Sequence, residues 1–190
     1  MVPALQALRH RLPRGGQLPH EEWERRHGGL TRLLWMLAAF LGTISVVLGY
    51  PVDHSVLHGL PVVGAAIGAG SRHCSRQLRS LACSFGLLTA AALGVHLMEG
   101  RIEAHFSFFV LIILLTLYEE WTVFALAVGF VLLHHGAMGM IQPTEVFRDQ
   151  DQFSQPWLWA GIHAIFVAAA GIAALVAWRL NEDVRRRMQD

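Results

Sequence analysis

The sequence is short of charged residues. Only 15% of its 190 residues are charged, against roughly 25% in ordinary soluble domains, and 54% are hydrophobic. The charged residues crowd into a few segments, residues 9–32, 72–79, 99–103, 145–151 and 179–190. Long neutral stretches lie between these segments. This segregation indicates a membrane protein rather than a soluble domain.

Cysteine is also scarce. Cys74 and Cys83 are the only two, and their spacing fits neither a CxxC pair nor a zinc knuckle, so we interpret them as unrelated thiols. The net charge of +1 gives no uniform basic surface and therefore no argument for nucleic acid. The first apolar run starts near Leu30 without a small-residue cleavage site, which argues against a cleaved signal peptide.

Six apolar segments predict an all-α fold, a bundle of six transmembrane helices. A basic segment, residues 1–29, comes first, and we expect its histidines, His10, His20 and His27, to lie in water. The predicted spans within the domain 30–178 are residues 30–50, 52–70, 81–98, 101–118, 121–141 and 157–178. A charged helical tail, residues 179–190, would link the bundle to an output domain.

Two details refine this bundle. Gly64 and Gly68 have the GxxxG spacing that lets helices approach closely, so we expect the second span inside the bundle. With six spans, all of the arginine-rich segments fall on one side, apart from Arg101 and Arg148. The positive-inside rule makes that side cytoplasmic, with both termini, and predicts a multi-pass protein of the cell inner membrane.

Histidines from five spans fall at the opposite, outer ends. At about 1.5 Å per residue, His58 and His163 lie roughly 9 Å below the outer ends of their spans. The fourth span is short, since His105–Tyr118 covers only about 20 Å of a core of about 30 Å. Its helix is therefore expected to begin near Arg101 and to draw Glu103 and His105 into the bundle. We expect one shared site in this layer.

Imidazole and carboxylate side chains together suit transition metals. A site for one or two ions of copper, iron or zinc is predicted. His134 and His135 point about 100° apart, and we favour His134. The candidate ligands are His54, His58, His96, Glu99, Glu103, His105, His134, His135 and His163.

Other chemistries remain open. A haem b would need two axial histidines and a slot, for which Gly94, Gly129, Gly136 and Gly139 could give clearance. Coupled histidines could instead sense protons. Met98, Met138 and Met140 would be soft ligands for Cu(I), but methionine on membrane helices normally serves packing, which is the interpretation we favour. A transporter would need polar residues continuing to the cytoplasmic side, and these are lacking.

The ordered motifs resemble a known family. Residues 101–109 (RIEAHFSFF), 117–121 (LYEEW), 132–136 (LLHHG) and the pair Pro156 and Trp157 followed by His163 are similar to the N-terminal integral-membrane sensor module of bacterial signalling proteins. That module precedes diguanylate cyclase/phosphodiesterase, histidine kinase or chemoreceptor output domains. The resemblance covers about residues 30–187. The family often has a histidine where Ser107 stands here.

The leading hypothesis is a membrane sensory domain with no catalytic residues, in which an outer His/Glu site signals through the last helix. The alternative is a membrane metalloenzyme of the oxidase or hydroxylase type, which needs an open coordination position. The expected partners are the lipid bilayer, a metal or metal-bound small ligand, a cytoplasmic output domain and a second copy of the chain in a homodimer.

Overall fold

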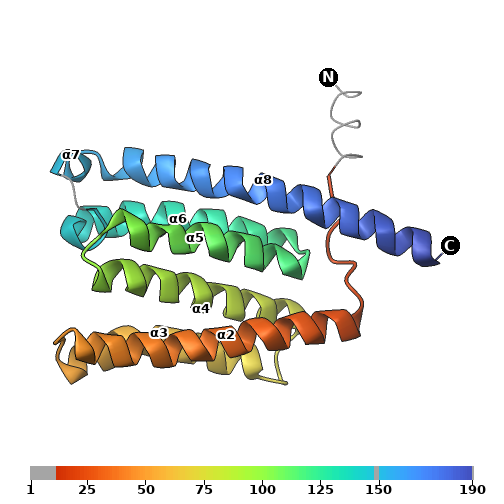
Figure 1. The fold of residues 1–190 in the computed structure, drawn as a ribbon, viewed down its shortest axis with the longest axis horizontal. Coiled ribbons are helices and arrows are strands. Elements are labelled where there is room, and N and C mark those ends of the chain that lie inside the picture. The colour runs from red at the N-terminus through yellow and green to blue at the C-terminus, as the bar shows by residue number, and fades with distance from the viewer. Residues whose placement is uncertain (1–11, 148–149, 190) are drawn as a thin grey trace.

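Helices that lie side by side make up the protein (Figure 1). The computed structural model describes residues 12–147 and 150–189, which contain no β-strand, so the all-α prediction is confirmed. Residues 1–11, Arg148 and Asp190, which belong to predicted segments, lie outside the described residues. The long helices are α2 (His20–Val47), α3 (Val52–Gly70), α4 (Arg76–Leu97), α5 (Ile102–Leu115), α6 (Trp121–Ile141) and α8 (Pro156–Gln189). The short elements are the 3₁₀ helices η1 (Thr116–Tyr118) and η2 (Pro143–Glu145) and the helix α7 (Gln150–Phe153).

Four of these helices, α2, α4, α6 and α8, are long and apolar enough to cross a membrane by length and composition. The apolar stretch Ile102–Tyr118, formed by α5 and η1, is shorter, and α3 carries Asp53 and Pro61. The helices therefore suit a membrane protein, and the number of six spans stays a prediction.

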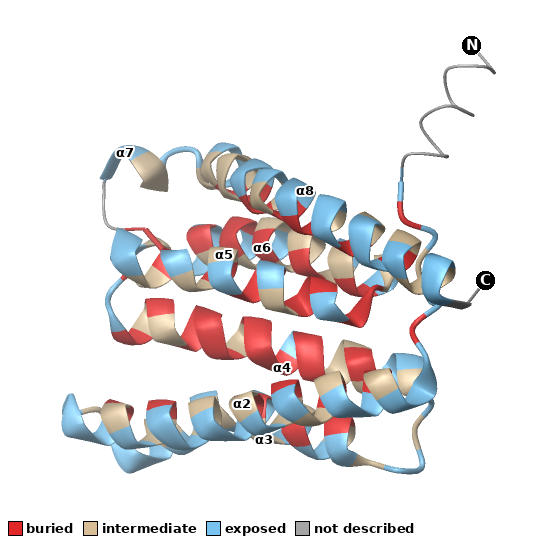
Figure 2. Ribbon diagram, turned by 45° about the vertical axis from the view of Figure 1, so that its right-hand side comes forward, coloured by how far each residue is buried: buried red, intermediate tan, exposed pale blue. Residues whose placement is uncertain are grey.

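Helix α4 forms the centre of the bundle and is its most buried helix (Figure 2). Ser75 caps its N-terminus by accepting a hydrogen bond from the Leu78 amide, which satisfies one otherwise unpaired N–H group. Its small residues allow close packing: an added Cβ at Gly86 would lie 2.8 Å from Ala65 of α3 and from Leu34 of α2. On its other side α4 contacts α5 and α6, which pack with α8.

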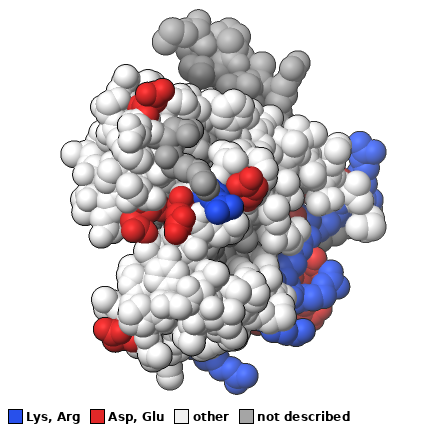
Figure 3. Space-filling view, turned by 60° about the vertical axis from the view of Figure 1, so that its left-hand side comes forward, with Lys and Arg blue, Asp and Glu red and all other residues white. Residues whose placement is uncertain are grey.

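The two ends of the bundle differ in charge. We call the end with the α2–α3 turn, η2 and α7 the histidine end, and the opposite end, with the C-terminus, the arginine end (Figure 1). Figure 3 brings the histidine end forward, and scattered acidic residues face the viewer there. Most of the basic residues that can be seen lie along the right-hand and lower edges of this view. The alternation of helices thus brings the arginine-rich segments together, as predicted.

Two expectations need correction. Helix α2 begins at His20, so His27 lies in a helix and is buried, not in water. Helix α3 lies at the edge of the bundle, where an added Cβ at Gly64 would meet no atom within 4 Å. Gly68 does face α4, where an added Cβ would lie 3.5 Å from Ala82, and the tighter contact between the two helices is at Gly86. Trp178 is buried, and its indole donates a hydrogen bond to Glu182 over 2.8 Å.

Candidate functional site

The histidines at the histidine end form two clusters, not the one shared site that was expected. His105 of α5, His135 of α6 and His163 of α8 form what we call the buried triad, with ring centroids 5.1–5.3 Å apart. His54 and His58 of α3 and His96 of α4 form the edge triad. The division follows the packing, because the edge triad joins α3 to α4, whereas the buried triad joins α5, α6 and α8 on the other side of α4.

The buried triad is shielded from solvent. His105 and His135 are 3% and 1% exposed, and His163 is half-buried. Phe108 packs edge-on against His135 at a centroid distance of 5.2 Å, and the Phe147 ring lies 6.1 Å from His163. These rings shield the imidazoles from solvent.

Backbone hydrogen bonds orient two of the three imidazoles. His105 Nδ1 lies 3.0 Å from the Arg101 carbonyl and His163 Nδ1 lies 2.8 Å from the Trp159 carbonyl, each one turn earlier. A carbonyl only accepts, so Nδ1 carries the proton and the lone pair is on Nε2. This is the tautomer in which metal-binding histidines are commonly held.

Buried nitrogens of the triad lack partners. His105 Nε2 and both ring nitrogens of His135 make no hydrogen bond to any described residue. Leaving a buried polar group unpaired costs about 1–3 kcal/mol. The three rings lie side by side, but their donor atoms are less closely gathered than those of the edge triad, the group of three found within 4.8 Å of one another among the described residues.

A cavity of about 470 Å³ reaches the buried triad from the histidine end. His105 and His163 line it, together with Arg101, Glu103 and Gln152. Glu103 is exposed, which differs from the expectation that it would lie inside the bundle, because it points from the first turn of α5. It lines the entrance to the triad.

The edge triad is more open to solvent. The donor atoms of His54, His58 and His96 lie within 4.8 Å of one another, and His96 Nδ1 pairs with the Glu145 carboxylate. Tyr50 stacks on His54 at a centroid distance of 5.0 Å. Sequence reasoning missed Glu145, since the loop after α6 gave no sign that it returns to α4.

The other predicted ligands lie apart from the buried triad. His135, not the favoured His134, enters it, and His134 stacks on Phe130 and lines a cavity beside the edge triad. Glu99 is exposed in the α4–α5 turn, with a φ of 54°. Ser107 lines a separate apolar groove with Leu33 and Leu37, because two residues along a helix turn the side chain about 200° from His105.

The glycines considered for a haem slot are partly filled. An added Cβ at Gly136 would lie 2.2 Å from the Trp157 ring, and one at Gly139 would lie 2.6 Å from Phe147. These glycines admit aromatic rings between α6 and α8. Gly94 and Gly129 have no atom within 4 Å of an added Cβ. Among the methionines, Met138 lines the cavity beside the edge triad.

The arginine end holds a buried ionic network that the sequence did not suggest. Glu119, 1% exposed, pairs with Arg26 of α2 and Arg185 of α8. Glu182 accepts hydrogen bonds from the amides of Arg14 and Gly15 over 2.9 and 3.0 Å. Glu119 thereby connects the first and last helices, whereas the neighbouring Glu120 pairs with Arg76 of α4.

His27 also has a structural role at this end. Its Nδ1 lies 2.8 Å from the Tyr118 hydroxyl and its Nε2 lies 3.0 Å from the Ala69 carbonyl. Trp23 stacks on the ring at a centroid distance of 4.6 Å. Both ring nitrogens of His27 therefore have partners inside the bundle.

A known protein resembles this chain in sequence. No family model matches. No solved structure matches. The chain is 33% identical over 189 residues to the transducer protein Htr8 of Halobacterium salinarum, an alignment that covers 93% of this chain. The chain spans 29% of the length of that relative. It is therefore similar, over nearly all of its own length, to part of a transducer.

Proposed function

We propose that this chain is the membrane sensory domain of a signalling protein. The transducer named above, similar over 93% of this chain, and the four apolar helices support this role. We further propose six spans in the cell inner membrane with both termini cytoplasmic. The support is the arginine end, since the positive-inside rule assigns arginine-rich loops to the cytoplasm.

The buried triad is the proposed sensory site, and one observation carries this proposal. Backbone carbonyls hold His105 and His163 with Nε2 free, while both nitrogens of the buried His135 are unpaired. A transition metal, copper, iron or zinc, would take these nitrogens as ligands and supply a coordination position for a small ligand. Glu103 at the cavity entrance and Arg101 would meet a ligand that enters from the outer side.

Signalling would use α8, which runs without a break from Pro156 to Gln189. His163 lies in its outer half, and Arg185 of the tail pairs with Glu119 at the arginine end. A ligand bound by all three histidines would stabilise the position of α8 in which His163 lies closest to His105 and His135. The tail would pass that shift to a cytoplasmic output domain, and a homodimer would bring two tails together.

The second candidate is a membrane metalloenzyme, which the cavity of about 470 Å³ at the triad favours, because a substrate would have access there. A haem b has weaker support, since Trp157 and Phe147 occupy the space at Gly136 and Gly139. Glu99, His54, His58, His96 and His134 lie outside the buried triad and are not its proposed ligands.

The test is metal analysis and an absorption spectrum of the purified chain. We expect the transition-metal content per chain to fall by one equivalent in His135→Gln and to stay unchanged in His73→Gln, a matched change at an exposed histidine of the α3–α4 loop. A Soret band would establish haem instead. A chain without metal or haem, whose folding is unaffected by His135→Gln, would contradict the proposed site. Metal-dependent turnover of an oxidisable substrate would favour the enzyme.

A further inference from the structure

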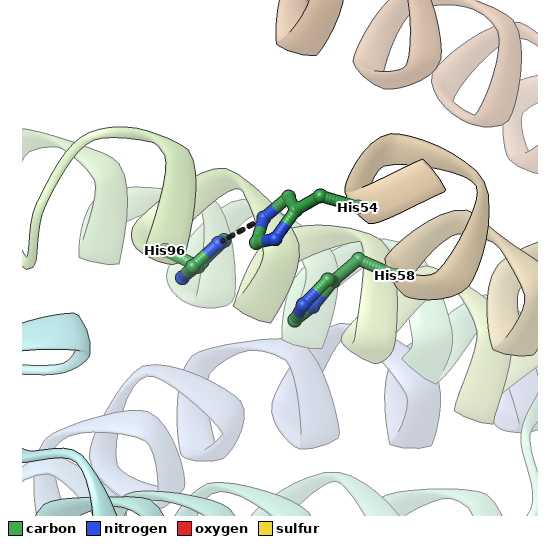
Figure 4. Close-up of side chains that lie close together, drawn as sticks. All are labelled: His54, His58 and His96. Atoms are coloured by element: carbon green, nitrogen blue, oxygen red, sulfur yellow. Dashed lines mark hydrogen bonds between the residues drawn. The ribbon is translucent and has the colours of Figure 1, made fainter. Parts of the chain in front are cut away.

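The edge triad has the arrangement of a metal site in its own right. His54 and His58 are four residues apart and share one face of α3, and His96 reaches them from the last turn of α4 (Figure 4). The rings of His58 and His96 are stacked, with centroids 4.9 Å apart and an angle of 7° between the planes. Both helices end at this point, so the three imidazoles converge where the bundle meets solvent.

Two imidazole nitrogens of the edge triad share one proton. His54 Nε2 and His96 Nε2 lie 3.0 Å apart, so a hydrogen bond between them needs a proton on only one. Glu145 pairs with His96 Nδ1, and a carboxylate accepts, which leaves the lone pair of His96 on Nε2. His54 Nε2 therefore donates to His96 Nε2, and a cation that displaces this proton would have both nitrogens as ligands.

The spacing matches zinc coordination. Zn–N bonds of about 2.0–2.1 Å at a tetrahedral angle put two ligand nitrogens about 3.3 Å apart, close to the observed 3.0 Å. The Glu145–His96 pair also has the form of the carboxylate–histidine–zinc arrangement, in which the carboxylate orients the ring and raises its basicity. Three imidazoles without a thiolate are a ligand set that suits zinc.

A cavity of about 370 Å³ leads to the triad, lined by His58, His96, Glu145 and, from α6, His134. His134 Nδ1 is buried and has no hydrogen-bond partner among the described residues. The cavity therefore leaves a fourth position accessible to water or to this fourth imidazole. None of these residues belongs to the buried triad.

We propose that the edge triad is a second metal site, separate from the proposed sensory site, that takes Zn²⁺ through His54, His58 and His96. Glu145 is a positioning residue that orients His96. Bound zinc would join the N-terminal end of α3 to the C-terminal end of α4 and hold η2 against them. The site does not depend on the proposed sensory function.

The test is a titration of the chelator-treated, purified chain with ZnCl₂ against a colorimetric zinc indicator. We expect one zinc equivalent that survives His135→Gln and His73→Gln and disappears in His58→Gln and in His54→Gln. His58 is exposed, so its variant should keep the circular dichroism spectrum of the parent. Zinc binding that persists in both edge variants, or that disappears with His135→Gln alone, would overturn the proposal.

Glu145 allows a second test. Glu145→Gln should weaken zinc binding about 10–100-fold, and Glu145→Asp should restore part of the loss. Co²⁺ in place of zinc reports the ligand geometry, and its visible absorption bands should keep their tetrahedral intensity in Glu145→Gln. Unchanged zinc affinity in Glu145→Gln would remove the assigned role of Glu145, and bands of a six-coordinate ion in the parent would overturn the three-histidine site.

Discussion

Arg185 donates hydrogen bonds from both terminal guanidinium nitrogens to the buried carboxylate of Glu119, and the Nη1–Oε1 distance is 2.9 Å. Glu119 lies in a left-handed turn with a φ of 52° and also pairs with Arg26 of α2. The tail of the last helix is thereby fixed to the first helix at the arginine end. This pairing sets where the tail leaves the bundle.

Removing the guanidinium should destabilise the protein. Arg185→Ala takes charged hydrogen bonds from a carboxylate that is 1% exposed, and such bonds contribute about 1.5–3 kcal/mol. We expect a lower thermal midpoint in detergent, measured by circular dichroism. Arg187→Ala, a matched change at an exposed arginine of the same helix, should leave the midpoint unchanged. Equal midpoints for the two variants would show that the pair contributes nothing.

Gly136 is expected to tolerate no side chain. Its added Cβ would lie 2.2 Å from the Trp157 ring, so Gly136→Ala forces α6 and α8 apart and should cost about 1–3 kcal/mol. Gly129→Ala on the same helix meets no atom within 4 Å and should be neutral or stabilising by up to about 1 kcal/mol, because alanine favours helices. Thermal unfolding of both variants measures the difference, and a stable Gly136→Ala would argue against this helix contact.

A histidine at position 107, as in the family that the sequence resembles, should add no metal ligand. Ser107 faces the groove with Leu33 and Leu37 and not the buried triad. Ser107→His should therefore leave the metal content per chain unchanged, measured by atomic emission on the purified protein. A gain of one equivalent in this variant would mean that α5 turns differently from the structure.

The native cysteines test the proposed orientation. Cys74 is partly exposed in the α3–α4 loop, whereas Cys83 is buried. A membrane-impermeant maleimide should label Cys74 in inside-out vesicles and not in intact cells, and Cys74→Ser should abolish the labelling. The substitution Gln152→Cys in the Cys74→Ser background should show the opposite pattern. Labelling of Cys74 from outside the cell would reverse the topology.

Much of the fold could be predicted because the position of each helix is determined by residues close to one another in the sequence. The helices α3 and α6 have the predicted bounds. Pro51 and the Glu119–Glu120 turn lie between consecutive helices, close to the predicted ends of the spans. The histidine layer at one end also follows from counting residues along each span. These features depend on hydropathy and turn chemistry, which act over a few residues.

The partition of the histidines could not be predicted in this way. Which imidazoles meet depends on the rotation of each helix and on which helices are neighbours, and both are set by long-range packing at contacts such as Gly86–Leu34 and Gly136–Trp157. For the same reason His135 and not His134 enters the buried triad, and Glu145 reaches His96 from a distant loop. The sequence alone determined a helical membrane-type bundle with its histidines at one end. Only the tertiary structure decided that they form two triads, because side chains from separate helices come together only once the helices have packed.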